Sequence, residues 1–219
     1  MNLNMSDVKG LTRKERSERT RRTIVQAATE EFGASGYHGT TMAGIARRAG
    51  FAVQTVYFVF HTKPLLLTAT IDQAVVGDEE PTPPELTEWW QEGISTKDGH
   101  RALEVFVTNV AVIEERAALL DRVARAAAMT DPEVLEVLVH HERLRVAGFR
   151  SYLETFSARG LLRRELALDE ATDVLLTLVG STTFLEFTEG RAWSIKRWTS
   201  WTTATLAGLL LESTKGRRR

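Results

Sequence analysis

Apolar residues recur at helical spacing along most of the chain. Between residues 16 and 34, Ile24, Ala28 and Phe32 stand four apart with charged residues between them, which is typical of an amphipathic helix. No segment shows the strict alternation of a strand. The same reasoning predicts further helices over residues 41–48, 53–60, 65–76, 99–128 (one helix, or two with a break near Ala117), 132–158, 170–188 and 195–212. The sequence therefore predicts an all-α protein.

Glycine and proline divide these helices. Gly33, Gly36 and Gly39 end the first long helix, and the prolines of residues 78–84 require a loop. We expect a basic flexible arm over residues 1–15 and a three-helix unit over 16–63. A fourth helix then joins that unit to a C-terminal helical bundle, the two together forming residues 64–219. The three basic residues of 217–219 are expected to form a disordered tail.

Composition narrows the class of protein. The 219 residues are 43% hydrophobic and 26% charged, as in globular domains, so the chain forms one large domain or two small ones. It has no cysteine, so we expect neither disulfides nor a thiolate metal site. No apolar run approaches the ~20 residues of a membrane span, and no secretory signal is visible. We therefore expect a cytoplasmic protein that does not enter a membrane.

Charge is unevenly distributed. The net charge is −1, yet residues 1–63 hold ten basic and five acidic side chains, and the remainder holds 18 basic and 24 acidic ones. A basic first quarter on an acidic body favours a polyanion-binding module. Charge alone fits a solvated charged face equally well.

The spacing within residues 42–60 is more specific. Counted from Met42, Ala46 is fifth, Gly50 ninth and Val56 fifteenth. A helix-turn-helix needs a small residue where its helices approach, a glycine at the sharp turn, and apolar residues that fix the crossing angle. With a preceding amphipathic helix and a basic N-terminal segment, this spacing predicts a DNA-binding helix-turn-helix, although a purely structural helical hairpin fits the spacing as well.

Residues 40–63 also resemble a known family. Thr41 opens the second helix, Thr55-Val56-Tyr57 with Phe60 forms the third, and Thr62-Lys63 follows. This pattern is similar to the DNA-binding domain of TetR-family transcriptional regulators, with Val56 in place of the usual leucine. Gln54 and His61 depart from the family's frequent residues. The resemblance is specific over residues 20–70 and generic beyond them. It implies a dimeric, ligand-responsive regulator, most often a repressor.

The expected DNA contacts follow from the position of a recognition helix in the major groove. Gln54 can bond bidentately to adenine, and Val53 or Ala52 can pack on a thymine methyl group. Gln54 could instead be an ordinary solvated residue, and the ring of Tyr57 could lie mainly in the core. The full set of expected DNA-binding residues is Arg21, Arg22, Thr41, Ala52, Val53, Gln54, Thr55, Tyr57, His61 and Lys63, those outside 52–54 at phosphates by resemblance or charge.

The last two helices are expected to form a dimer interface, because two-fold dimers match palindromic operators. They could instead pack only on their own domain. The expected interface residues are Leu175, Leu178, Val179, Thr182, Trp198, Trp201, Thr205 and Leu209. By resemblance, residues 99–158 hold a pocket for a small-molecule effector, for which Trp89, Asn109 and His140 are the candidates. His140 and His141 are adjacent and so point apart, which argues against a metal site.

No motif of an enzyme is present, so we expect no catalytic residues and no cofactor. The expected function is a ligand-released repressor that binds double-stranded DNA as a homodimer. The alternative is a helical adaptor or ligand carrier that uses the helix pair as a scaffold. The identities of operator, effector and regulated genes are not encoded in these patterns.

Overall fold

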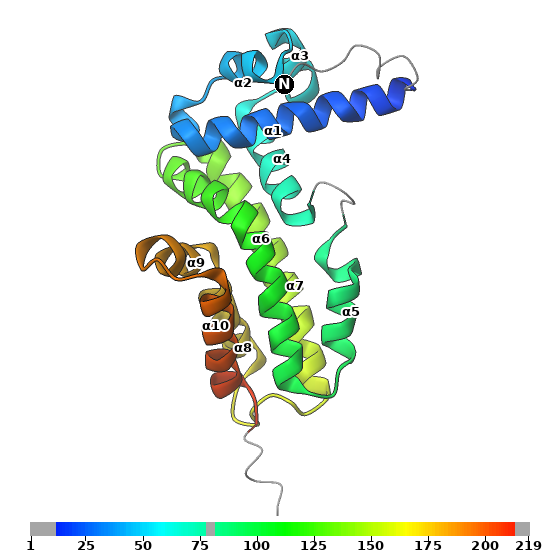
Figure 1. The fold of residues 1–219 in the computed structure, drawn as a ribbon, viewed down its shortest axis with the longest axis vertical. Coiled ribbons are helices and arrows are strands. Elements are labelled where there is room, and N and C mark those ends of the chain that lie inside the picture. The colour runs from blue at the N-terminus through cyan, green and yellow to red at the C-terminus, as the bar shows by residue number, and fades with distance from the viewer. Residues whose placement is uncertain (1–11, 78–81, 213–219) are drawn as a thin grey trace, which may run out of the picture. The chain divides into compact units, whose positions relative to one another are not determined.

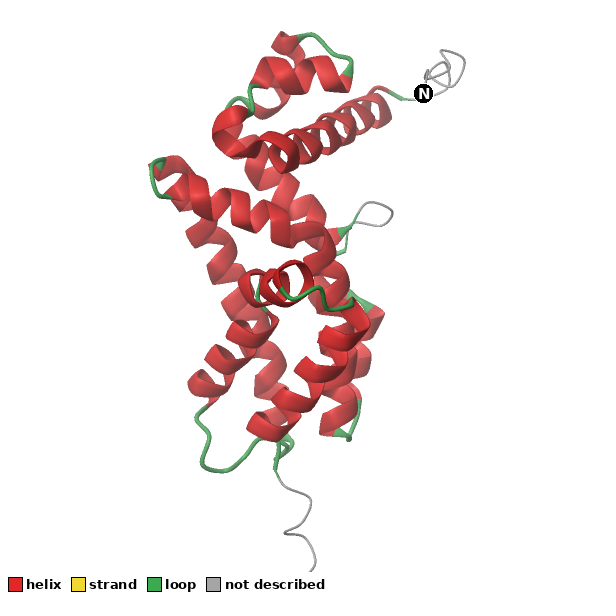
Figure 2. Cartoon of the chain, turned by 60° about the vertical axis from the view of Figure 1, so that its left-hand side comes forward, coloured by secondary structure: helices red, strands yellow, loops and turns green. Residues whose placement is uncertain are grey.

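The computed structural model describes residues 12–77 and 82–212. The chain divides into two compact units, Met1–Ile71 and Asp72–Arg219. The described residues are helical and contain no strand, only an isolated bridge between Leu162 and Leu211 (Figure 2). The all-α fold predicted from the sequence is confirmed.

The first unit is built from one long helix and several shorter ones (Figure 1). Its elements are α1 (Arg13–Gly39), α2 (Met42–Ala49), α3 (Val53–Phe60) and the first part of α4 (Lys63–Val76). α1 begins at Arg13, earlier than expected, because Thr12 and Glu15 form a reciprocal capping box. Gly36, at φ 66° and ψ 178°, breaks the helical path of α1 near its end.

The second unit contains two long helices and several shorter ones. They are η1 (Pro84–Leu86), α5 (Glu88–Ser95), α6 (Gly99–Ala128), α7 (Pro132–Ala158), α8 (Leu168–Val179), α9 (Ser181–Leu185), η2 (Glu186–Gly190) and α10 (Ile195–Leu210). α6 is the central helix: α5, α7, α9 and α10 all pack against it (Figure 1). Pro132 lies in the first turn of α7, and the Asp131 carboxylate caps that turn.

Besides the earlier start of α1, the structure decides between the two alternatives for α6 and differs from the sequence-based expectation at two further places. α6 is one continuous helix, with no break at Ala117. α5, around Trp89 and Trp90, was not predicted, since it is only eight residues long. The helix expected over 170–188 is interrupted at Gly180, where a Cβ atom would lie 2.7 Å from the Leu176 carbonyl oxygen.

Some expectations fall outside the described residues: the arm as far as residue 11, the loop over 78–81 and the tail from residue 213. Within the described residues, no helix is both long enough and apolar enough to span a membrane.

Candidate nucleic-acid interface

The core of the first unit comes from all of its helices. Ile24 and Phe32 of α1, Ile45 of α2, and Val56 and Phe60 of α3 are each at most 3% exposed. The apolar spacing seen in the sequence thus fixes which side of each helix faces inward. As a consequence, the opposite side of α3 is available to a partner.

The turn between α2 and α3 depends on Gly50. This residue lies in the left-handed region at φ 75°, which glycine adopts without a Cβ penalty. The Gly50 amide donates to the Arg47 carbonyl at 3.3 Å, and the Phe51 amide donates to the Ala46 carbonyl at 3.0 Å. Ala46 is buried, as expected for the small residue at the helix crossing. The helix-turn-helix geometry predicted from the spacing is present.

The outer side of α3 is unusually aromatic. Tyr57 is 50% exposed and Phe58 is 82% exposed. Gln54, one turn before Phe58, is also exposed. Ala52 precedes α3 without any side-chain cap, so the amides of the first turn of α3 have no side-chain acceptor there. Phe58 was not predicted as a site residue. Val56 and Phe60 are the buried positions of α3, so the pattern of buried residues could have shown that Phe58 faces outward.

Lys63 has a structural position. Its ammonium group donates to the carbonyls of Tyr37 at 2.9 Å and of Thr40 at 3.1 Å. It also lies 4.0 Å from the centre of the Tyr37 ring. These contacts use two of the three ammonium donors. Sequence reasoning treated Lys63 only as a phosphate ligand, because the spacing did not reveal the carbonyls of the α1–α2 connection.

The remaining predicted residues lie around α2 and α3. Thr41 caps α2, since its Oγ1 accepts from the Gly44 amide at 3.0 Å. His61 is exposed and follows α3 at φ 58°, in a tight turn closed by the Thr62 amide and the Phe60 carbonyl at 2.6 Å. Positive φ at a non-glycine residue stores of order 1–3 kcal/mol of strain. Val53 and Thr55 are partly exposed.

Basic side chains differ in whether the chain neutralises them. Arg48 is paired with Glu30 at 2.9 Å and with Glu31 at 2.6 Å. The Arg21 guanidinium lies 4.6 Å from the centre of the Phe60 ring, which orients it beside α3. Arg22 and Arg47 are exposed. Arg21 and Arg22 are therefore placed to carry positive charge on the surface of this unit.

The predicted dimer residues divide into two groups. Leu175, Val179 and Trp198 are completely buried in the second unit's own core. Their assignment to an interface is wrong, because a side chain without exposed surface in one chain cannot contact another. The residues of the set that keep exposed surface are Leu178, Thr182, Trp201, Thr205 and Leu209.

The predicted effector residues are not brought together. Trp89 packs edge-on against Trp90 and Phe106 in an aromatic cluster. The Asn109 amide is turned back onto the Val105 carbonyl at 2.8 Å. His140 is exposed on α7 and contacts the ring of His141.

Comparison with known proteins agrees with this geometry. Residues 24–70 match the model of the bacterial regulatory proteins of the tetR family. Over this segment the chain is similar to the N-terminal part of that family, and the match does not extend to the rest of the chain. The matched residues include all of α2 and α3 and the turn at Gly50. A comparison with curated proteins finds no match.

Solved structures of transcriptional regulators share the fold over most of the chain. A putative TetR-family transcriptional regulator from Mesorhizobium loti is 24% identical, with a TM-score of 0.68 over 90% of this chain and 96% of that one. NalD, the secondary repressor of the MexAB-OprM multidrug efflux pump in Pseudomonas aeruginosa, is 21% identical, with a TM-score of 0.68 over 90% and 99%. FadR from Bacillus subtilis, solved with stearoyl-CoA, is 14% identical, with a TM-score of 0.69 over 85% and 97%.

Proposed function

We propose that this protein is a transcriptional repressor that binds a palindromic DNA operator as a homodimer and is released by a small-molecule effector. The observation that carries the proposal is the outward side of α3, where Gln54, Tyr57 and Phe58 are exposed on a compact basic unit. Exposed aromatic and amide side chains on the second helix of a helix-turn-helix suit major-groove binding.

Within this proposal, residues at the start of α3 read bases. Gln54 bonds to adenine, and Ala52 or Val53 packs on a thymine methyl group, each with ~1–3 kcal/mol of discrimination. Phe58, one turn further on, adds an apolar surface beside Gln54. Thr55, partly exposed on the same helix, is proposed to contact a phosphate.

Phosphate contacts surround this helix. Thr41, Tyr57 and His61 supply hydroxyl and imidazole groups, and Arg21 and Arg22 supply charge. Lys63 belongs to the same proposed set, and its ammonium group also donates to two backbone carbonyls of its own chain.

The link from effector to DNA would run through α4. Lys63–Val76 is one continuous helix that contains the boundary between the units. In the second unit, Arg116 of α6 donates to the Ala74 carbonyl at 2.8 Å, and His141 of α7 lies 3.0 Å from the Asp72 carboxylate. A change in α6 or α7 would therefore reach α4 directly, which supports a shift between DNA-binding and released populations.

The first experiment is DNA binding by the purified protein. It uses DNA upstream of the protein's own gene, a salt titration, and non-specific competitor. Gln54→Ala should weaken selective binding about 30-fold for each half-site, since the mid-range cost of one bidentate base contact is about 2 kcal/mol. Gln26→Ala is the matched control, because Gln26 is also an exposed glutamine and lies on α1. Lys63 is left intact, since its replacement would disturb the fold.

The outcomes separate the alternatives. One outcome supports both the proposed function and the proposed role of α3 in base recognition. It is selective, salt-dependent binding that is weakened by Gln54→Ala and not by Gln26→Ala. Equal effects of the two variants would refute the assigned contact. If neither this DNA nor selection from random sequences yields selective binding, the chain is a helical adaptor or ligand carrier instead.

A further inference from the structure

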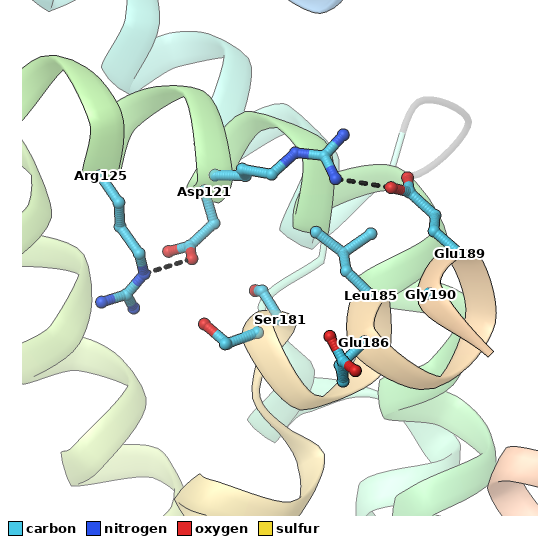
Figure 3. A pocket seen from close by; sticks show the side chains of 9 residues that line it. Asp121, Arg125, Ser181, Leu185, Glu186, Glu189 and Gly190 are labelled. Atoms are coloured by element: carbon cyan, nitrogen blue, oxygen red, sulfur yellow. Dashed lines mark hydrogen bonds and ion pairs between the residues drawn. The ribbon is translucent and has the colours of Figure 1, made fainter.

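The charged side chains around a cavity in the second unit largely satisfy one another. This cavity, of about 480 Å³, lies between α6 and residues 181–190 (Figure 3). Arg125 donates to Asp121 at 2.6 Å, and Arg122 donates to Glu189 at 2.5 Å (Figure 3). The lining therefore singles out no class of ligand. The exposed side of α3 in the first unit has a more selective chemistry.

That side of α3 (Val53–Phe60) is neutral. The helix includes no lysine, arginine, aspartate or glutamate. Val56 and Phe60 are 0% and 3% exposed, so they fix which side of the helix faces inward. Gln54 and Phe58 are exposed and stand four residues apart, so they share the outward side. Recognition by this side therefore relies on an amide and on apolar groups rather than on charge.

Phe58 is the most exposed of the described phenylalanine, tyrosine and tryptophan residues. It is 82% exposed, and Tyr57 follows at 50%. A large apolar ring in water is unfavourable, and burial of the ring against a partner removes that cost. Because Phe58 lies one turn from Gln54 on the same side of α3, a partner that binds the Gln54 amide also covers the Phe58 ring.

The cationic side chains near α3 are paired, bound to the backbone, or on another helix. Arg48 is paired with Glu30 at 2.9 Å and with Glu31 at 2.6 Å. The ammonium group of Lys63 donates to two backbone carbonyls. Arg47 is exposed but belongs to α2, and the first helix of a helix-turn-helix crosses the DNA backbone. Contacts to base edges are therefore left to α3 itself.

The four bases require different side chains in the major groove. Guanine presents two acceptors, which arginine or lysine binds, and cytosine presents an amino group, which aspartate or glutamate accepts. α3 carries none of these four residue types. Adenine is bound by an amide such as that of Gln54, and the methyl group of thymine by an apolar side chain such as that of Phe58. The chemistry of α3 thus matches A·T pairs.

We propose that α3 selects a half-site whose contacted base pairs are A·T, with Gln54 at an adenine and Phe58 at the methyl group of a thymine. Four residues along an α-helix span about 6 Å, and successive base pairs are about 3.4 Å apart. The thymine therefore lies about two base pairs from the adenine. This inference rests on the proposed DNA-binding function, and adds the base pairs that are selected and a second residue that selects them.

The test begins with selection of DNA by the full chain from random sequences. We expect A·T pairs at the positions whose preference changes in Gln54→Ala. Each thymine of one selected half-site is then replaced in turn by deoxyuridine, which removes only the methyl group. At the thymine with the predicted spacing, the replacement should weaken binding about fourfold, which corresponds to ~0.8 kcal/mol for one buried methyl group.

Phe58→Ala shows whether Phe58 is the contact. The same deoxyuridine replacement should have no further effect in this variant, because the side chain that touches the methyl group is absent. Phe58→Leu keeps an apolar side chain and should keep the sensitivity to the methyl group. Leu86→Ala is the matched control, because Leu86 is 72% exposed and lies in the second unit. Circular dichroism confirms that each variant is folded.

The proposal is overturned if deoxyuridine weakens binding equally for the wild type and Phe58→Ala, or if no replacement has any effect. It is also overturned if the positions that depend on Gln54 are G·C pairs. In these cases selective binding remains, so the regulator stands and only the assigned base pairs fail. If the chain selects no DNA sequence, the proposed function fails together with this inference.

Discussion

The two units differ in whether their buried polar side-chain atoms have hydrogen-bond partners. In the first unit, the Thr40 hydroxyl lies within hydrogen-bonding distance of the carbonyls of Glu31 (3.0 Å) and Gly36 (2.7 Å), and Lys63 donates to two further carbonyls. In the described part of the chain, the buried side-chain atoms without a partner all belong to the second unit: Glu114 Oε2, Arg145 Nε, Trp198 Nε1, Thr202 Oγ1 and Thr203 Oγ1.

This difference matches the different tasks that we propose for the two units. A unit that presents a rigid helix to DNA gains from complete internal hydrogen bonding, because an unpaired buried group costs about 1–3 kcal/mol. A unit that binds a ligand needs polar groups whose missing hydrogen bonds the ligand can form. The second unit also contains a fully paired region, since Tyr152 donates to the Ala102 carbonyl at 2.9 Å amid the aromatic cluster of α5, α6 and α7.

The largest expected effect is that of Glu114→Gln on the pH dependence of the free energy of unfolding. Burial raises the pKa of Glu114 from 4.5 to about 7 on folding, so the folded state binds more protons than the unfolded state between these values. The wild-type protein should therefore lose about 3 kcal/mol of stability as pH rises from 4.5 to 7.5, and the variant should not. The measurement is the free energy of unfolding in urea at several pH values. Parallel pH curves for the two proteins would contradict the prediction, and Glu115→Gln, at the exposed neighbouring residue, is the control.

The next effect concerns Lys63 in the first unit. Lys63→Met removes the donor from the carbonyls of Tyr37 and Thr40, with an expected loss of about 2 kcal/mol. Lys14→Met, at an exposed lysine with only a 3.9 Å ion pair, should change stability little. All five tryptophans lie in the second unit, so tryptophan fluorescence reports on that unit alone. Circular dichroism follows the helices of both units. The loss should therefore appear in the dichroism transition. Equal effects of the two substitutions would show that Lys63 has no structural role.

The smallest effect tests the comparison most directly, because one substitution is made in both units. Thr40→Val should destabilise the protein by about 1 kcal/mol, since the carbonyls of Glu31 and Gly36 lose the hydroxyl that donates to them. Thr203→Val should stabilise it by a similar amount, since the buried hydroxyl it removes has no partner. Both threonines are at most 3% exposed. The measurement is urea unfolding of the two variants. Changes of the same sign in the free energy of unfolding would contradict the contrast between the units.

Sequence reasoning succeeded where local rules apply. The bounds of α3, α6 and α7 agree with those expected from apolar spacing, Gly50 and Pro132. It failed where packing between segments that are distant along the chain determines whether an element forms. α5 is short and amphipathic, and it is held against α6 and α7 by Trp90 and by the absence of a side chain at Gly93, where a Cβ atom would lie 2.0 Å from the Tyr152 hydroxyl oxygen.

The candidate site shows the same division. The positions of Gln54 and Tyr57 on the outer side of α3 could be derived from the sequence, because the core residues of a short helix fix its orientation. The carbonyl contacts of Lys63 and the burial of Trp198 could not, because they depend on segments that are distant along the chain.

The sequence by itself determined the all-α class, the helix-turn-helix and its basic charge, since each follows from the order of residues within a few turns. Only the tertiary structure decided which apolar stripe of α8 and α10 is core, where the cavity lies, and that Glu114 is buried without a full set of partners. The physical reason is that burial and hydrogen-bond satisfaction are properties of three-dimensional neighbours. Periodicity along one helix shows that a side is apolar, but not what covers it.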